Sequence, residues 1–175
     1  MQFPADFDEF LREFQAESDR AAAVLGAAYL DARLDELLRA KFVSGPKFVA
    51  ELLKGEGALG RFSARISTAY AVGLISEPVA YDLHLVRSIR NDFAHKQHGL
   101  SFSTDRIAQR VSELRVLKEL RDQKGALIPI DLSPRKKFNL AFGLLLVMGI
   151  ESRIEKMPKF ESPSSEAITM TADNT

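Results

Sequence analysis

The sequence predicts an all-α protein, a single-domain bundle of six or seven helices. Apolar residues recur at spacings of three and four residues along most of the chain, which is typical of amphipathic helices. Breaks rich in Gly and Pro, such as Ser44-Gly45-Pro46, separate these stretches. Residues 126–130 could be extended or a packed loop, but Pro129 argues against a central strand.

Length and composition set the class of protein. The chain has 175 residues, which suggests one helical domain over 1–156 followed by a polar tail over 157–175 that we expect to be disordered. Hydrophobic residues make up 46% and charged residues 27%, an ordinary globular balance. Lys plus Arg equals Asp plus Glu at 24 each, and this zero net charge argues against an autonomous nucleic-acid-binding domain.

Several classes of site and location are disfavoured. The chain has no cysteine, so disulfides and thiolate metal sites are excluded and a reducing cytoplasm is expected. Its three histidines lack a metal-binding spacing, so we expect no metal and no cofactor. The start of the chain is acidic, unlike a signal peptide, and the apolar run 138–150 is shorter than the ~20 residues that cross a bilayer. We therefore predict no membrane association.

The first two helices are predicted over 6–15 and 17–42. The second is the longest helical signal in the chain, and Ser18 or Asp19 can cap its start. Asp31 lies at the centre of its apolar stripe, with Arg20 on the same side three turns earlier. Small residues in the same helix would let a neighbouring helix approach closely: Ala22, Ala23, Gly26, Ala27 and Ala28.

Two shorter helices are predicted over 47–54 and 62–75. The pair, joined by a turn rich in glycine, could be read as a helix-turn-helix. Its second helix, however, offers only Arg61 and Arg65 and few other groups that could read base edges. An ordinary helical hairpin is favoured.

The helix over 78–95 is predicted to lie at the centre of the bundle. Its buried stripe contains Arg90, between Leu83 and Val86 on the wheel. A guanidinium on a core-facing position needs an acidic partner. We predict that Asp31 supplies it, with Asp19 and Glu17 as second candidates.

The last two helices follow two serine signals. Ser101 or Ser103 can cap a helix that carries the apolar stripe Ile107, Val111, Leu114 and Leu117. Ser133-Pro134 begins a helix that runs to about residue 156. This helix is apolar on nearly every face over 138–150, and complete burial by so small a chain is difficult, so we predict a homo-oligomeric contact.

Separated blocks over residues 9–155 resemble the mannitol operon repressor (MtlR) family. The matching blocks are Glu17-Ser18-Asp19-Arg20, Ala28-Tyr29-Leu30-Asp31, Phe62-Ser63-Ala64-Arg65-Ile66, Ala69-Tyr70 with Gly73-Leu74-Ile75, Arg90 to His95, and Leu100-Ser101-Phe102. The resemblance implies an all-α fold and a role in regulating a mannitol (sugar-alcohol) uptake operon. Neither the family nor this sequence has an evident DNA-reading element, so direct DNA binding is doubtful and repression through a protein partner is expected.

A shorter resemblance lies on the string Arg90-Asn91-Asp92-Phe93-Ala94-His95. It matches the R-x(4–6)-H motif of HEPN-domain proteins, many of which are metal-independent ribonucleases. It implies an alternative function, an RNA-cleaving or nucleotide-binding module in which His95 is the general acid/base and Arg90 stabilises the phosphorane.

We favour a structural role for this string over catalysis. Arg90 would be half of a salt bridge, His95 a helix C-cap, and Asn91 and Asp92 partners of the following loop. No enzymatic activity and no catalytic residue are therefore expected. The residues predicted to form the structural or functional core are Asp19, Arg20, Asp31, Arg90, Asn91, Asp92 and His95.

Overall fold

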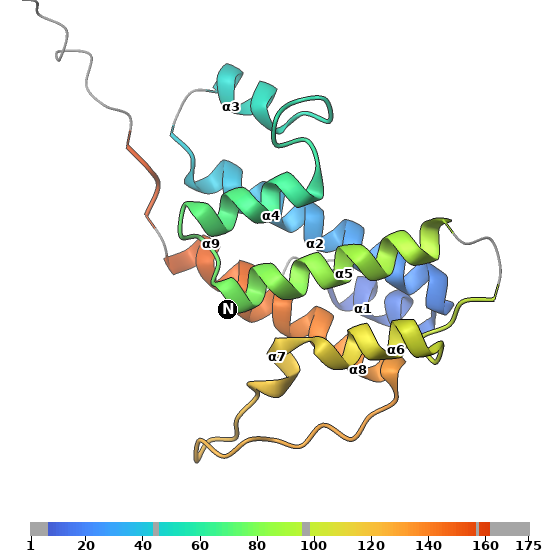
Figure 1. Cartoon of the computed structure of the whole chain (residues 1–175). Helices are drawn as coiled ribbons and strands as arrows, with labels where there is room; N and C mark the ends of the chain where they lie inside the picture. The colour runs from blue at the N-terminus through green and yellow to red at the C-terminus, as the bar shows by residue number, and fades with distance from the viewer. Residues whose placement is uncertain (1–6, 44–45, 96–98, 157, 162–175) are drawn as a thin grey trace, which may run out of the picture.

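The computed structural model describes residues 7–43, 46–95, 99–156 and 158–161. Its elements are α1 (Phe7–Ala16), α2 (Asp19–Lys41), α3 (Pro46–Leu53), α4 (Phe62–Ala71), α5 (Glu77–His95), α6 (Asp105–Glu113), α7 (Arg115–Lys118), α8 (Pro134–Leu144), the π-helix η1 (Leu145–Glu151) and α9 (Ser152–Lys156) (Figure 1). Only Leu114 separates α6 from α7, and α8, η1 and α9 follow one another without a break. The described chain thus has seven helical rods, and the predicted all-α fold is confirmed.

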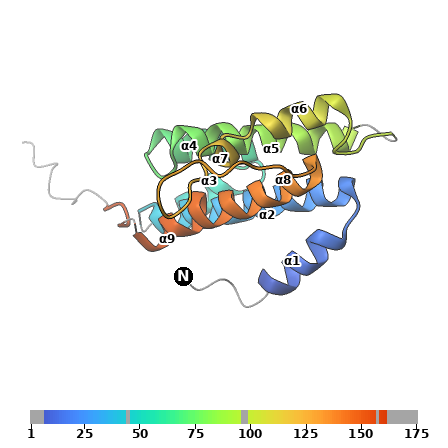
Figure 2. The ribbon, with the colours of Figure 1, turned by 90° about the horizontal axis from the view of Figure 1, so that it is seen from below.

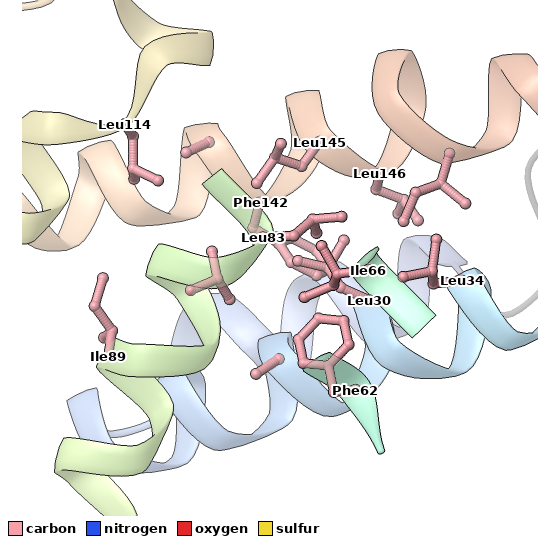
Figure 3. Close-up of a cluster of buried hydrophobic side chains, with 14 of the residues drawn as sticks. Leu30, Leu34, Phe62, Ile66, Leu83, Ile89, Leu114, Phe142, Leu145 and Leu146 are labelled. Atoms are coloured by element: carbon pink, nitrogen blue, oxygen red, sulfur yellow. The ribbon is translucent and has the colours of Figure 1, made fainter. Parts of the chain in front are cut away.

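The rods form two layers around a shared core. Figure 2 shows α4, α5 and α6 along one side of the bundle, and α2 with the α8–η1–α9 rod along the other. Helix α2 contacts α1, α4, α5, η1, α8 and α9. In Figure 3, Leu30 of α2, Ile66 of α4 and Leu83 of α5 point into one cluster with Phe142. Helix α2 is therefore the element around which the others assemble.

The ends of the helices follow local chemistry. Ser18 caps α2, since its Oγ accepts the Ala21 N–H at 3.2 Å, and Ser133 caps α8 ahead of Pro134, as predicted. The predicted cap at Ser101 or Ser103 is wrong, because Thr104 is the N-cap residue of α6. Helix α4 ends at Ala71, before the predicted residue 75, because Gly73 has a φ of +73° and turns the chain.

Close approach to α2 does depend on its small residues. Ala22, Ala23 and Ala27 are buried, and a Cβ on Gly26 would meet Phe14 Cε2 at 3.0 Å, whereas Ala28 is exposed and takes no part. The space is filled by an aromatic cluster of Phe10, Phe14, Tyr29 and Phe142, with Phe14 and Phe142 ring centroids 4.7 Å apart. This cluster attaches α1 and α8 to α2.

The long apolar helix is buried by its own chain. Buried side chains along α8 and η1 are Phe138, Ala141, Phe142, Leu145, Leu146 and Ile150. Among its large apolar side chains only Met148 is exposed, at 59%. One chain thus covers most of this helix, while Leu140, Leu144 and Val147 are half-buried, and the homo-oligomer stays a prediction. No helix within the described ranges is long and apolar enough to cross a membrane.

The predicted Asp31–Arg90 ion pair is wrong. Arg65 of α4 is the partner of Asp31, with Nη1 2.7 Å from Oδ1, and its Nη2 lies 3.1 Å from Asp35. The same Nη2 donates to the Leu53 carbonyl at 3.0 Å. Arg90 is half-buried and donates to Asn91 Oδ1 of its own helix at 2.9 Å.

The register of the two central helices explains this difference. Asp19, at the start of α2, accepts the Phe102 N–H at 2.8 Å, so the C-terminal end of α5 lies near the N-terminal end of α2. At 1.5 Å per residue, Asp31 is about 18 Å along α2 from Asp19, whereas Arg90 is only about 8 Å from the end of α5. A helical wheel places both residues on inner faces but carries no information on their height along the bundle.

The end of the described chain returns to α2. The Phe160 N–H donates to the Lys41 carbonyl at 2.7 Å, and the Phe160 and Phe42 rings stack with centroids 6.5 Å apart. The predicted disorder of the tail concerns mainly 162–175, which lie outside the described residues, as does His98.

The ion-pair assignment predicts different costs for two arginine substitutions. Arg65→Ala leaves two partly buried carboxylates and the Leu53 carbonyl without their donor, and should lower the free energy of unfolding by about 2 kcal/mol. Arg90→Ala removes a hydrogen bond within one helix and should lower the free energy of unfolding by less than about 1 kcal/mol. Urea unfolding of both variants measures this, and an Arg90→Ala cost equal to or above that of Arg65→Ala would contradict it.

Candidate functional site

The residues of the Arg90–His95 string point in different directions. Asp92 pairs with Arg106 Nη2 at 3.2 Å and with Arg110, both on α6. Asn91 accepts from Arg90, and His95 is exposed as the last residue of α5. The expected bonds of Asn91 and Asp92 to the following loop are therefore replaced by bonds to Arg90 and to α6. Asp92 attaches α6 to α5, which is a structural role.

Asp19 attaches the start of α2 to the segment that precedes α6 and to the first turn of α8. One of its carboxylate oxygens accepts the Phe102 N–H and the other lies 3.3 Å from Arg135 Nη1. The Arg135 guanidinium in turn lies over the rings of Phe14 and Phe102, 5.8 and 5.4 Å from their centroids. Asp19 is thus bound away from Arg90, and Arg20 beside it is half-buried.

Carboxylates of the chain take up much of its arginine charge. Within the described residues, the arginines that pair with carboxylates include Arg33, Arg39, Arg65, Arg106, Arg110, Arg115 and Arg135. Arg33 links α2 to the π-helix, since its Nη2 donates to Glu151 Oε2 at 2.8 Å. Except for Arg39, which pairs with Asp35 of its own helix, these guanidinium groups join different helices, which leaves them less available to phosphate groups of a nucleic acid.

One buried ionisable group that sequence reasoning missed is Asp82 of α5. Its side chain has no exposure, and its two oxygens accept the N–H groups of Arg115 and Val116, each at 2.8 Å. Burial raises the pKa of this carboxyl above its ordinary value, and the two amide bonds oppose that rise. The helical periodicity could have shown that Asp82 is buried, because it lies four residues before Val86 and seven before Ile89, on the buried stripe.

A cavity of about 390 Å³ lies next to Asp82, between the start of α5, α7 with the residues after it, and the π-helix. Its walls are mainly apolar, and its polar lining residues are Ser76, Asp82, Glu119, Arg121 and Arg153. π-Helical turns are frequent at functional sites. A cavity of this size with few polar groups is the usual form of a small-ligand site.

A second cavity, of about 550 Å³, lies beside the segment that joins α7 to α8. Its lining includes Leu117, Lys118 and Lys137 together with residues 127–130. Figure 1 shows this segment projecting from the bundle. Leu127, Ile128 and Leu132 on it are 57%, 37% and 38% exposed. We call residues 120–132 the apolar arm.

The geometry needed for RNA cleavage is not assembled around Arg90 and His95 in the single chain. Neither residue lines either of these two cavities, and Arg90 is bonded to Asn91. The ribonuclease alternative stays a prediction. Within the described residues no group of three or more His, Asp or Glu side chains could hold a metal ion.

Comparison with known proteins gives two findings. A family model described as MtlR, mannitol repressor, matches residues 16–132. The fold is similar to a structure described as the X-ray structure of the MtlR-HPr complex from Escherichia coli, with 20% sequence identity and a TM-score of 0.63, covering 86% of this chain and 99% of that chain. No curated protein matches the chain.

The bonding of Asp82 predicts a pH-dependent effect of its substitution. Asp82→Asn leaves one of the two amides without an acceptor and should lower the free energy of unfolding by about 2 kcal/mol at about pH 4. Because the folded-state pKa is raised, the stabilisation by Asp82 is full below the unfolded pKa and is lost as the pH rises through the folded pKa. The difference between wild type and Asp82→Asn should therefore shrink with rising pH.

Thermal or urea unfolding of wild type and Asp82→Asn, from about pH 4 upward, measures how their difference in stability changes with pH. Asp131→Asn, at an exposed position, is the matched control and should follow the wild-type profile. Parallel profiles for wild type and Asp82→Asn would show that the carboxyl does not titrate as described.

Proposed function

This chain belongs to the mannitol repressor (MtlR) family, and we propose that it regulates transcription of a mannitol or related sugar-alcohol operon mainly through protein–protein contacts. The family match over residues 16–132 is the observation that carries the proposal. The proposed site of action is the cytoplasm, where such an operon is transcribed.

The position of Arg65 supports action without direct DNA reading. A helix-turn-helix over α3 and α4 would need side chains of α4 to face a major groove. Arg65 instead faces α2, where it is 12% exposed and bonded to Asp31 and Asp35. Arg61 is then the remaining basic side chain of that predicted reading helix, at its N-cap position.

The balance of charge supports the same interpretation. The chain carries as many acidic as basic residues, and many of its arginines are held in ion pairs between helices. Affinity for DNA depends on cations that are free to replace counterions along the phosphate backbone. A contact with another protein requires no such excess.

HPr is the proposed partner. The similar solved structure is described as a complex of MtlR with HPr, and a chain of the same family and fold is a candidate for the same kind of contact. Isothermal titration calorimetry of this chain with HPr from the same organism tests the proposed interaction directly, by measuring its affinity.

We assign the partner contact to the apolar arm. Three of its apolar side chains, Leu127, Ile128 and Leu132, are at least 37% exposed within six residues of the sequence, whereas isolated exposed apolar side chains are common on any surface. The arm has a fixed turn, where Asp122 Oδ1 accepts the Lys124 and Ala126 N–H groups at 2.8 and 2.9 Å. A preorganised apolar segment loses little entropy on binding.

The arm predicts the effect of a double substitution on HPr binding. Leu127→Ser with Ile128→Ser removes apolar area from the proposed interface and should weaken the affinity by about tenfold or more. The fold should be unaffected, because both side chains are exposed. Isothermal titration and thermal unfolding of the variant measure the two effects.

Phe48→Ser is the matched control, since Phe48 is 80% exposed on α3, away from the arm. It should bind HPr as the wild type does. Equal affinities of all three proteins would refute the arm as the interface, and no binding of HPr to the wild type would refute HPr as the partner.

A further inference from the structure

The cavity beside Asp82 has the form of a ligand site that the proposed function does not use. Its volume of about 390 Å³ falls within the range of small-molecule sites. The apolar side chains that line it are Pro78, Val79, Val116, Leu120, Leu144, Leu145 and Met148. Most of its surface is thus suited to an apolar body, and only a few groups could bond to a polar one.

Two specific contacts shape the walls. Asp82 accepts the Arg115 and Val116 N–H groups and so holds the start of α7 against α5. On the opposite side the π-helix brings Gly149 so close to α5 that a Cβ there would meet Val79 Cγ1 at 3.0 Å. The cavity is therefore formed by fixed elements without a ligand, which reduces the cost of ordering on binding.

Arg153 gives this cavity an unmet hydrogen-bond donor. It lines the cavity, and its Nε is buried without a hydrogen-bond partner among the described residues. The Nε itself has almost no accessible surface, so an anion in the cavity would pair with the terminal nitrogens of the guanidinium, in a charge-assisted bond.

The other charged groups of the lining are already engaged or lie at the mouth. Both oxygens of Asp82 are bonded to backbone amides, and Arg121 donates to the Gly125 carbonyl at 2.9 Å. Glu119 is exposed to solvent, where water screens its charge. Arg153 is therefore the charged group of this lining best placed to bind a ligand.

We propose that this cavity binds a small amphiphilic organic anion, whose carboxylate pairs with Arg153 and whose apolar body lies against Val79, Val116 and Leu145. A short-chain fatty carboxylate has this chemistry. A free sugar alcohol does not, because its hydroxyl groups would find few partners among these apolar walls. The proposal does not rest on the partner or the operon proposed above.

The test uses hexanoate and its neutral analogue hexanamide as probes of the full chain. Methyl NMR spectra recorded during titration with hexanoate should show saturable shifts of Val79, Val116, Leu144 and Leu145. Hexanamide should bind about tenfold more weakly, because it cannot form the ion pair.

Arg153→Met keeps an unbranched apolar stem and removes the guanidinium with its charge, and it should weaken hexanoate binding by about tenfold. Arg153→Lys should retain part of the affinity. Arg87→Met is the matched control, since Arg87 also has a buried and unpartnered Nε but does not line the cavity, and it should bind hexanoate as the wild type does.

Three results would overturn the proposal. They are the absence of saturable shifts at the cavity methyl groups of the wild type, equal binding of hexanoate and hexanamide, and equal binding by folded Arg153→Met and wild type. The wild-type comparison of the two probes decides the matter even if Arg153→Met does not fold.

Discussion

A carboxylate without solvent exposure fixes how the second half of the chain lies on the first. Asp82 accepts two consecutive amides where α6 ends and α7 begins, and this attachment holds the start of α7 against α5. Asp82 and Val116 line the cavity beside this contact, and so do Leu120 and Arg121, the first residues of the apolar arm. Burying a carboxyl group is costly unless its hydrogen bonds are made, so the two amide bonds are what make this buried position acceptable.

Elsewhere, ionic groups join helices rather than face solvent. Arg65 joins α4 to α2, Arg33 joins α2 to the π-helix, and Asp92 joins α5 to α6. The chain as a whole carries no excess of cations, and these pairs occupy several of its guanidinium groups, whereas nucleic-acid binding depends on free cations. Membership of the mannitol repressor family and this internal neutralisation together favour regulation through contacts with a protein.

Helix positions could be predicted from the sequence because they depend on local signals. Periodic apolar residues, Ser18, and Ser133 with Pro134 specify where rods begin and which face is buried. Which side chains pair between helices could not be predicted. A helical wheel shows which face of α5 carries Arg90, but not where Arg90 lies along the bundle axis relative to Asp31. Asp82 was on the buried stripe in the wheel, yet its partners are backbone amides more than thirty residues away, which side-chain reasoning does not reveal.

The attachment of α7 to α5 by Asp82 is tested most directly by amide hydrogen exchange at Arg115 and Val116. If the carboxylate holds these two amides in the folded protein, they should exchange only through global unfolding, at rates similar to those of the central amides of α5. Exchange of the Arg115 and Val116 amides as fast as that of the exposed residues of the apolar arm would contradict the account.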